Sequence, residues 1–323
     1  LTSLLVLALG AFAILAPGCG GGSGAALSYH VFPGDRIVNG RRLENLARTF
    51  EVFRQEFTHN LKRPLFWVQI LLLGFLIYMM STGKAQIGSG DARVGGKKAW
   101  ITSEFAVGQM LVMLMAIIYV FFVSVAAGMA LIRDDEQKVG ELLHSSPLRA
   151  GEYIWGKYAA VLATYVVILA FHIGFSMLCN HVLPHGGNAE FIGPFAAANY
   201  LRPMFVFGLP LLVLFTGSCF AIGGATRLPV LVFSFPIGVL LLDAFFLWDW
   251  SPAWLPLGVN RLLQFADPTG LRWMKETWLL VDKGVDFYNK QPIGLDALVI
   301  AQRFAIVAVG LGCVTWYARR FAS

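Results

Sequence analysis

The stretch AAGMALIRDDEQKVGELLHSSPLRAGEYIWGK, from Ala126 to Lys157, decides the fold because it is short and charged yet lies between two strongly apolar segments. Arg133 ends the apolar run before it, and a new apolar run begins after Lys157. Apolar runs of this length cross a lipid bilayer as helices. The chain is therefore predicted to span a membrane on both sides of this charged insert.

The insert itself predicts a short helix with one apolar face, from about Asp135 to His144. Three acidic residues, 134–136, stand where such a helix would start and suit the positive end of its dipole. Apolar residues then recur at steps of three and four, and Pro147 ends the pattern. The apolar positions are Val139, Leu142 and Leu143. An amphipathic helix held between two membrane helices suits docking into a groove of a soluble partner.

The string RDDEQKVGELLHSSPLRAGEYIWGK, residues 133–157, resembles the cytoplasmic loop between the second and third spans of type-2 ABC exporter permeases. In that family the loop reads roughly as Arg-(Asp/Glu)-x-Glu, a Gly-x-Leu-Glu-Leu-like core, Ser-Pro-Leu, and Gly-Lys before the third span. The resemblance implies a coupling helix that sits on an ATP-hydrolysing subunit. The residues that it implies for this coupling are Asp135, Glu136, Val139, Glu141, Leu142, Leu143 and Pro147.

Partners and cofactors follow from the same resemblance. It implies two ABC ATPase subunits on separate chains, which would bind the ATP and Mg, so that no cofactor is bound by this chain. It also implies pairing with a second permease, as a homodimer or a heterodimer. In the family, the segment between the fifth and sixth spans often forms re-entrant helices.

Composition supports a membrane protein. Of 323 residues, 57% are hydrophobic and 14% are charged, whereas soluble domains carry roughly 25% charged residues. The net charge of +6 is spread between apolar runs, which is typical of membrane-flanking residues and not of a nucleic-acid surface. The four cysteines lie far apart, so neither a disulfide framework nor a metal knuckle is expected.

The predicted fold is an all-α integral membrane protein with six transmembrane helices in a permease domain over residues 64–323. Each apolar run is long enough to cross roughly 30 Å of hydrocarbon at about 1.5 Å per residue. The predicted spans are 65–80, 105–131, 158–178, 204–222, 230–247 and 298–317.

Two segments precede this domain. Residues 1–40 are apolar and then Gly-rich; their first part is read as a secretory or lipoprotein signal, as an extra span, or as sequence upstream of the protein proper. In residues 41–63, apolar side chains recur every three or four residues, and basic side chains lie on the other face. This pattern predicts an amphipathic helix that lies at the cytoplasmic surface before the first span.

Basic residues set the orientation. They gather at 41–63, at 133–157, at Arg227 and at the end of the chain, which all fall on one side if the spans alternate. That side is predicted to be the cytoplasm, with both ends of the six-span domain on it and the protein in the inner (plasma) membrane. The long segment 248–296 then lies outside, where we expect short helices at Leu255–Phe265 and Trp273–Phe287.

The string Gly151 to Tyr158 matches most of a phosphate-binding loop. Tyr158 stands where Ser or Thr should reach the magnesium ion, and no strand precedes the glycines. We therefore interpret it as a helix that enters the membrane, with Lys157 at the headgroups. Because no nucleophile–base pair, carboxylate dyad or metal cage is recognisable, we expect no enzyme and no metal site.

Charged and polar residues within the spans are the remaining functional candidates. Asp243 and Arg303 lie towards the outer ends of the fifth and sixth spans, and we hypothesise that they pair, directly or through water. The alternative is that each reaches the outer surface independently. Candidates for lining a path are Gln69, Gln109, His172 and Gln302. Such residues also join neighbouring helices by hydrogen bonds.

The sequence thus predicts the transmembrane permease subunit of an ATP-driven exporter, energised by separate ATPase chains. The alternative is a membrane anchor or assembly factor that docks a soluble partner and transports nothing.

Overall fold

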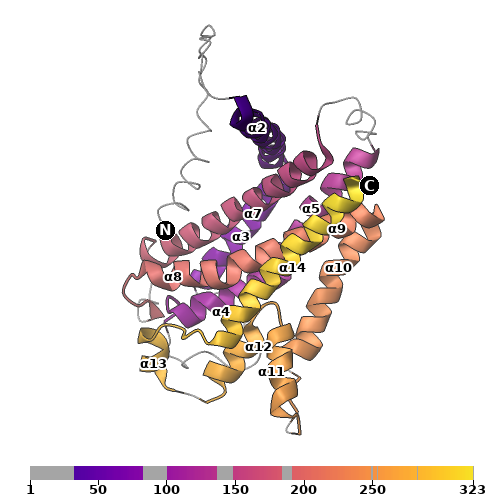
Figure 1. Ribbon diagram of the computed structural model, residues 1–323. Coiled ribbons are helices and arrows are strands. Elements are labelled where there is room, and N and C mark those ends of the chain that lie inside the picture. The colour runs from indigo at the N-terminus through magenta and orange to yellow at the C-terminus, as the bar shows by residue number, and fades with distance from the viewer. Residues whose placement is uncertain are drawn as a thin grey trace. The chain divides into compact units, whose positions relative to one another are not determined.

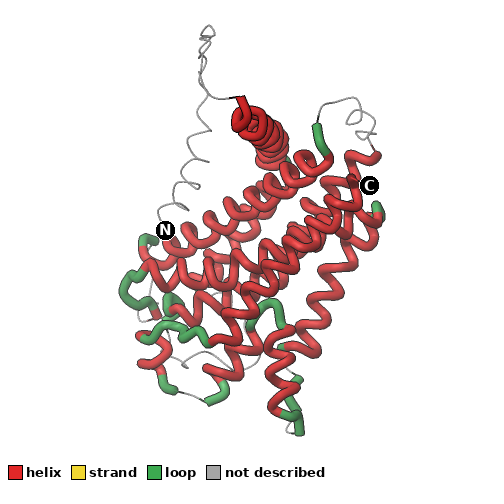
Figure 2. Tube along the Cα trace, viewed as in Figure 1, coloured by secondary structure: helices red, strands yellow, loops and turns green. Residues whose placement is uncertain are grey.

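A computed structural model of the chain describes residues 33–82, 100–136, 148–183, 191–248, 250–252, 254–281 and 283–322. It describes no side chain in 33–44 and none at Asp135. Residues from Glu44 onward form one compact unit, and the arrangement below concerns that unit (Figure 1). Helices are the regular elements of the described residues, which contain no strand (Figure 2).

Among the described residues, six helices are long and apolar enough to cross a membrane, and each contains one of the predicted spans. A single π-helical turn interrupts two of them and ends a third. In chain order, the six helices are α3 (Pro64–Ser81); α4 (Glu104–Leu114), η2 (Met115–Tyr119) and α5 (Val120–Glu136); α7 (Ala150–His181); α8 (Ala197–Pro203), η4 (Met204–Gly208) and α9 (Leu209–Thr226); α10 (Pro229–Leu242) and η5 (Asp243–Leu247); and α14 (Ala297–Ala322).

Local sequence explains where several of these helices begin and end. Pro64 and Pro229 stand at the first position of α3 and α10, where a missing backbone N–H costs no hydrogen bond. Ser103 caps α4 by accepting from the backbone N–H of Ala106 at 3.3 Å. Arg227 ends α9 in the left-handed region, with φ of 53°.

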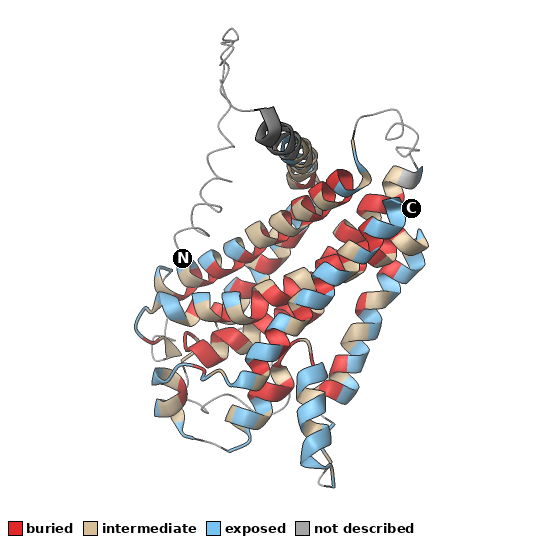
Figure 3. Cartoon of the chain, viewed as in Figure 1, coloured by how far each residue is buried: buried red, intermediate tan, exposed pale blue. Residues whose placement is uncertain are grey.

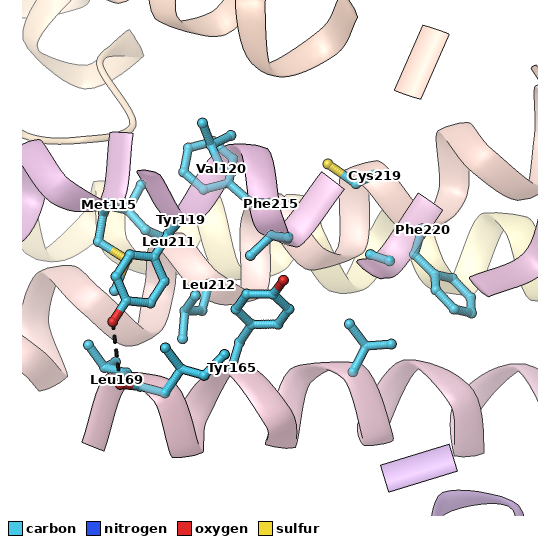
Figure 4. Packing of buried hydrophobic residues seen from close by; sticks show 14 of the residues in the cluster. Met115, Tyr119, Val120, Tyr165, Leu169, Leu211, Leu212, Phe215, Cys219 and Phe220 are labelled. Atoms are coloured by element: carbon cyan, nitrogen blue, oxygen red, sulfur yellow. Dashed lines mark hydrogen bonds between the residues drawn. The ribbon is translucent and has the colours of Figure 1, made fainter. Parts of the chain in front are cut away.

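Helix α9 lies at the centre and contacts α5, α7, α10 and α14 (Figure 1). Figure 4 shows how buried side chains from η2, α5, α7 and α9 meet in this core, among them Tyr119, Tyr165 and Phe215. Glycines allow the closest approaches: a Cβ on Gly217 would lie 2.2 Å from the carbonyl oxygen of Gly310. Small residues of this kind let membrane helices approach closely, backbone against backbone.

Contacts between helix ends define two opposite ends of the bundle. Asp134 of α5 contacts Lys157 of α7, and Tyr153 of α7 stacks at 6.1 Å on Phe321 of α14. This end is called the predicted inner end, after the orientation expected from the basic residues. At the opposite end, the predicted outer end, Arg202 of α8 pairs with Glu104 of α4 at 3.1 Å. Which of the two ends faces the cytoplasm stays a prediction.

Apolar side chains remain exposed on the peripheral helices α3, α10 and α14 (Figure 3). Leu71 of α3, Val230 of α10 and Phe304 of α14 are each at least 70% exposed. In a bilayer such faces meet acyl chains, since lipid is as apolar as these residues.

The predicted helix over 135–144 does not begin where we expected, because its first residues belong to α5. Helix α5 continues to Glu136, so the acidic residues 134–136 lie at its C-terminal end and not at a new N-terminus. Asp134 tolerates this place because Lys157 neutralises it. Residues 137–147, and with them most of the predicted coupling helix, lie outside the described residues.

The long segment before the last span carries three short helical pieces at the predicted outer end. Helix α11 (Leu257–Ala266) corresponds to the first predicted helix. The second is broken into α12 (Leu271–Met274) with η6 (Lys275–Leu279) and α13 (Val285–Lys290). Gly284 precedes α13 with φ of 84°, a conformation that interrupts a helix.

Helix α2 (Pro33–Lys62) covers nearly all of the predicted surface helix and starts at Pro33, before the expected position 41. Leu46 and Phe50 of its predicted apolar face are 66% and 50% exposed, while Val52 packs against the core. Its role at the membrane surface stays a prediction. Residues 1–32 lie outside the described residues.

We predict that Gly310→Ala lowers stability while Gly312→Ala does not. A Cβ at Gly310 would lie 2.5 Å from the carbonyl oxygen of Val213, whereas nothing lies within 4 Å of one at Gly312. Overpacking of this kind costs about 1–3 kcal/mol. Thermal unfolding in detergent measures the difference, and equal melting temperatures for the two variants would contradict the close contact of α9 with α14.

Candidate functional site

A buried ion cluster lies at the predicted inner end, around Lys157 of α7. The side chain of Lys157 is only 5% exposed. Its Nζ lies 2.7 Å from Oε1 of Glu56 on α2 and also contacts the carboxylate of Asp134 on α5. One ammonium group thus bridges two carboxylates from two other helices.

Tyr153, one turn before Lys157 on α7, completes the cluster. Its hydroxyl donates to Oδ2 of Asp134, and the Nζ of Lys157 lies 5.2 Å from the centre of its ring. The ring also stacks on Phe321 near the end of α14. Four helices, α2, α5, α7 and α14, therefore meet at this cluster.

Gly156 allows α2 to reach the lysine. A Cβ at this position would lie 2.8 Å from Val52 and 2.9 Å from the carbonyl oxygen of Thr49, both on α2. Gly156 and Lys157 belong to the string Gly151–Tyr158 that resembles a phosphate-binding loop. The whole string lies within α7, and its lysine is occupied by carboxylates, which agrees with the prediction of a helix.

The cluster flanks the predicted coupling segment on both sides. Asp134 lies in the last turn of α5, followed by Asp135 and an exposed Glu136. After the segment, the backbone N–H of Arg149 donates to Glu152 at 3.0 Å and starts α7. The other residues implied for coupling, Val139, Glu141, Leu142, Leu143 and Pro147, lie outside the described residues.

A second polar cluster lies at the predicted outer end, around the fully buried Arg272 of α12. Its Nη1 donates to the backbone oxygens of Leu247 and Trp250, each at 3.0 Å. Its Nη2 donates to Oδ1 of Asn260 at 2.6 Å, and its Nε lies 3.2 Å from Glu276. This arginine fastens the end of the fifth span to α11 and η6.

Asp267 organises the turn between α11 and α12. Its Oδ1 accepts from the backbone N–H and hydroxyl of Thr269 at 2.9 and 2.5 Å, and its Oδ2 accepts from the N–H of Arg272 at 2.8 Å. Burial raises the pKa of the Asp267 carboxyl, and these donors and the charge of Arg303 oppose the rise. Gln302 of α14 donates to the carbonyl oxygen of Asp267.

Asp243 and Arg303 do not form the hypothesised direct pair in this structure, and their pairing through water stays a prediction. Arg303 donates to the carbonyl oxygen of Pro268 at 3.1 Å and to Oε1 of Gln302 at 2.5 Å. Both carboxylate oxygens of Asp243 are buried without a hydrogen-bond partner among the described residues. Asp243 and Arg303 do not reach the outer surface independently either, since they are 1% and 7% exposed. The carbonyl oxygen of Pro268, in the turn after α11, and the side chain of Gln302 accept from the arginine instead, and its Nε has no hydrogen-bond partner among the described residues.

The candidate path-lining residues are not brought together by hydrogen bonds. His172 lies 3.2 Å from the hydroxyl of Tyr119, a contact that joins α7 to η2. Gln302 bonds the outer turn, Gln69 lies near the start of α3, and Gln109 is half-buried on α4. The contacts of His172 and Gln302 are helix-joining contacts.

Histidine and cysteine form no metal centre in the part of the chain that the structure describes. His181 lies 3.1 Å from the hydroxyl of Tyr200, and His185 lies outside the described residues.

Reasoning from the sequence missed the partners of Lys157 and the roles of Asp267 and Arg272. The ionic partners of Lys157, Glu56 and Asp134, lie 101 and 23 residues away along the chain, a spacing that carries no periodic signal. For the outer turn a local signal exists, since the sequence Asp267-Pro-Thr-Gly270 is typical of an Asx turn.

No protein-family model matches the chain, and no curated protein matches it.

We predict that Lys157→Met destabilises the protein by about 3 kcal/mol, because it leaves two carboxylates without their buried counter-ion. The matched control is Arg54→Met, which removes a cation from an exposed pair with Glu51 and should change little. Chemical unfolding in detergent compares the two. A loss no larger for Lys157→Met than for the control would show that the cluster does not join the helices.

We predict that replacing either of two buried carboxyls at the predicted outer end by an amide changes stability in different ways. Asp267→Asn should cost about 1–3 kcal/mol, because one acceptor oxygen for Thr269 or Arg272 becomes a donor. Asp243→Asn should leave stability unchanged or raise it, since no described residue donates to that carboxyl. Melting temperatures decide, and a comparable drop for Asp243→Asn would reveal a partner for its side chain.

Proposed function

We propose that this chain is the membrane-spanning permease subunit of an ATP-driven ABC exporter. Separate ATPase subunits would bind the ATP and Mg and act on the segment between the second and third spans. The chain would pair with a second permease, identical or related. The resemblance of residues 133–157 to type-2 ABC exporter permeases motivates this proposal, and the six membrane-length helices are compatible with it.

The single observation that carries the proposal is the Lys157 cluster. It bonds α7 to α5 and α2 where the chain leaves the second span and enters the third. A force applied to residues 137–147 would reach both spans and the helix before the first span together. A device that transmits force needs such a joint, because independent helix ends would move separately.

Packing supports transmission deeper into the bundle. Helices α5 and α7 both contact α9, and α9 contacts α14 and α10. A Cβ at Gly223 of α9 would lie 2.3 Å from the carbonyl oxygen of Gly128 on α5, so these two backbones cannot slide past each other without rearrangement. Closure of the ATPases would then shift the central helices as a group between access states.

The experiment reconstitutes the full chain with a candidate ABC ATPase and measures complex formation and ATP hydrolysis. Glu141→Arg should weaken the complex and lower the chain-dependent hydrolysis, because the change reverses a charge on the proposed docking helix. The matched control is Asp286→Arg on α13, whose side chain is 90% exposed at the predicted outer end, and it should change neither quantity.

Two outcomes would contradict the proposal. Accessibility of a tag near Gly140 from outside the cell would place the segment on the wrong side of the membrane. A stable complex with a soluble partner that hydrolyses no ATP, with export unaltered in a deletion strain, would favour a membrane anchor or assembly factor.

A further inference from the structure

A small cavity lies where the bend between α2 and α3 meets α5 and α7. It has a volume of about 20 Å³, which is room for about one oxygen-sized group. Its polar lining comes from Asn60, Arg63, Gln69 and Thr164, and apolar side chains of α3, α5 and α7 complete it.

Two amide side chains in this cavity lack partners. Asn60 and Gln69 are 6% and 1% exposed, and their amide nitrogens have no hydrogen-bond partner among the described residues. The hydroxyl of Thr164 is already used by the carbonyl oxygen of Ala160 at 2.8 Å. A buried donor without an acceptor costs about 1–3 kcal/mol, so these two amides, which belong to residues that line one cavity, call for an acceptor.

The surroundings favour an anionic acceptor. Arg63 lines the cavity and links α2 to α3 in an extended conformation, as expected before Pro64. Leu65, Phe66 and Gln69 belong to the first turns of α3, so the positive end of this 18-residue helix lies at the cavity. Described carboxylates do not line it.

The outward face of α3 indicates where that anion comes from. Trp67, Val68 and Leu71 are 56%, 53% and 70% exposed, next along the helix from the cavity. Asn60 and Arg63 precede the first span, which places them at the depth of the headgroups, and Gln69 lies five residues, roughly 7.5 Å, into the span. An acyl chain can therefore lie along the apolar face while its headgroup reaches the cavity.

We propose that this cavity binds one phosphate oxygen of a phospholipid headgroup, held by the amides of Asn60 and Gln69 and by the charge of Arg63. The lipid would brace the bend between the surface helix α2 and the first span. This site requires only that α3 spans the bilayer, so it stands whether or not the chain belongs to an exporter.

The test titrates the delipidated full-length chain with phosphatidylglycerol and follows binding by native mass spectrometry. Gln69→Leu should raise the dissociation constant of the tightest lipid about tenfold or more, because it removes one hydrogen bond to a charged group. Its fold should survive, since the lost amide nitrogen has no hydrogen-bond partner among the described residues. Gln109→Leu is the matched control, because Gln109 is a half-buried glutamine of another span that does not line the cavity.

A competition arm separates the two sources of a phosphate oxygen. Inorganic phosphate at millimolar concentration should leave the lipid bound, because it lacks the acyl chains that α3 would contact. Displacement of the lipid by inorganic phosphate would overturn the lipid assignment. Equal lipid affinity for Gln69→Leu and the unaltered chain, or no tightly bound lipid at all, would show that the cavity holds water only.

Discussion

The structure depends on one constraint: inside a bilayer no water is available to satisfy a polar group. Every backbone N–H and C=O must then be bonded within the chain, which leaves helices as the form for six apolar runs. The same constraint governs side chains, because an isolated charge among apolar helices is costly. Lys157, Arg272 and Arg303 are all buried, and each bonds at least one acceptor that lies outside its own helix.

These buried cations do structural work at opposite ends of the bundle. At the predicted inner end, Lys157 joins three helices around the charged insert. At the predicted outer end, Arg272 of α12 donates to the carbonyl oxygens of Leu247 and Trp250 at the end of the fifth span, and Arg303 of the sixth span donates to the carbonyl oxygen of Pro268 in the turn before α12. Between the two ends, α9 contacts α5 and α14 through glycines. The proposed coupling function depends on this combination of tied ends and a closely packed centre.

The six apolar helices, predicted from local sequence, are confirmed, whereas two predictions that depend on contacts between distant residues are not. Span positions depend on local composition, and each predicted run lies inside one observed helix. The charge of the acidic residues 134–136 suits a helix N-terminus and predicts a new helix there. In the structure α5 extends through them, and Lys157 offsets the unfavourable placement of Asp134 at a helix C-terminus. Opposite charge and similar depth predict that Asp243 and Arg303 pair, but Arg303 donates to the carbonyl oxygen of Pro268, and Asp243 has no hydrogen-bond partner among the described residues.

The sequence by itself determined that the chain is helical, that it has six membrane-length segments, and that a charged insert separates the second from the third. These follow from hydropathy and run length, which act within some twenty residues. Only the tertiary structure decided which polar residues meet: Glu56 with Lys157, Arg272 with the end of the fifth span, and the unpartnered amides of Asn60 and Gln69 in one cavity. Such encounters depend on how helices cross and rotate, and that is set by packing between segments distant in the chain.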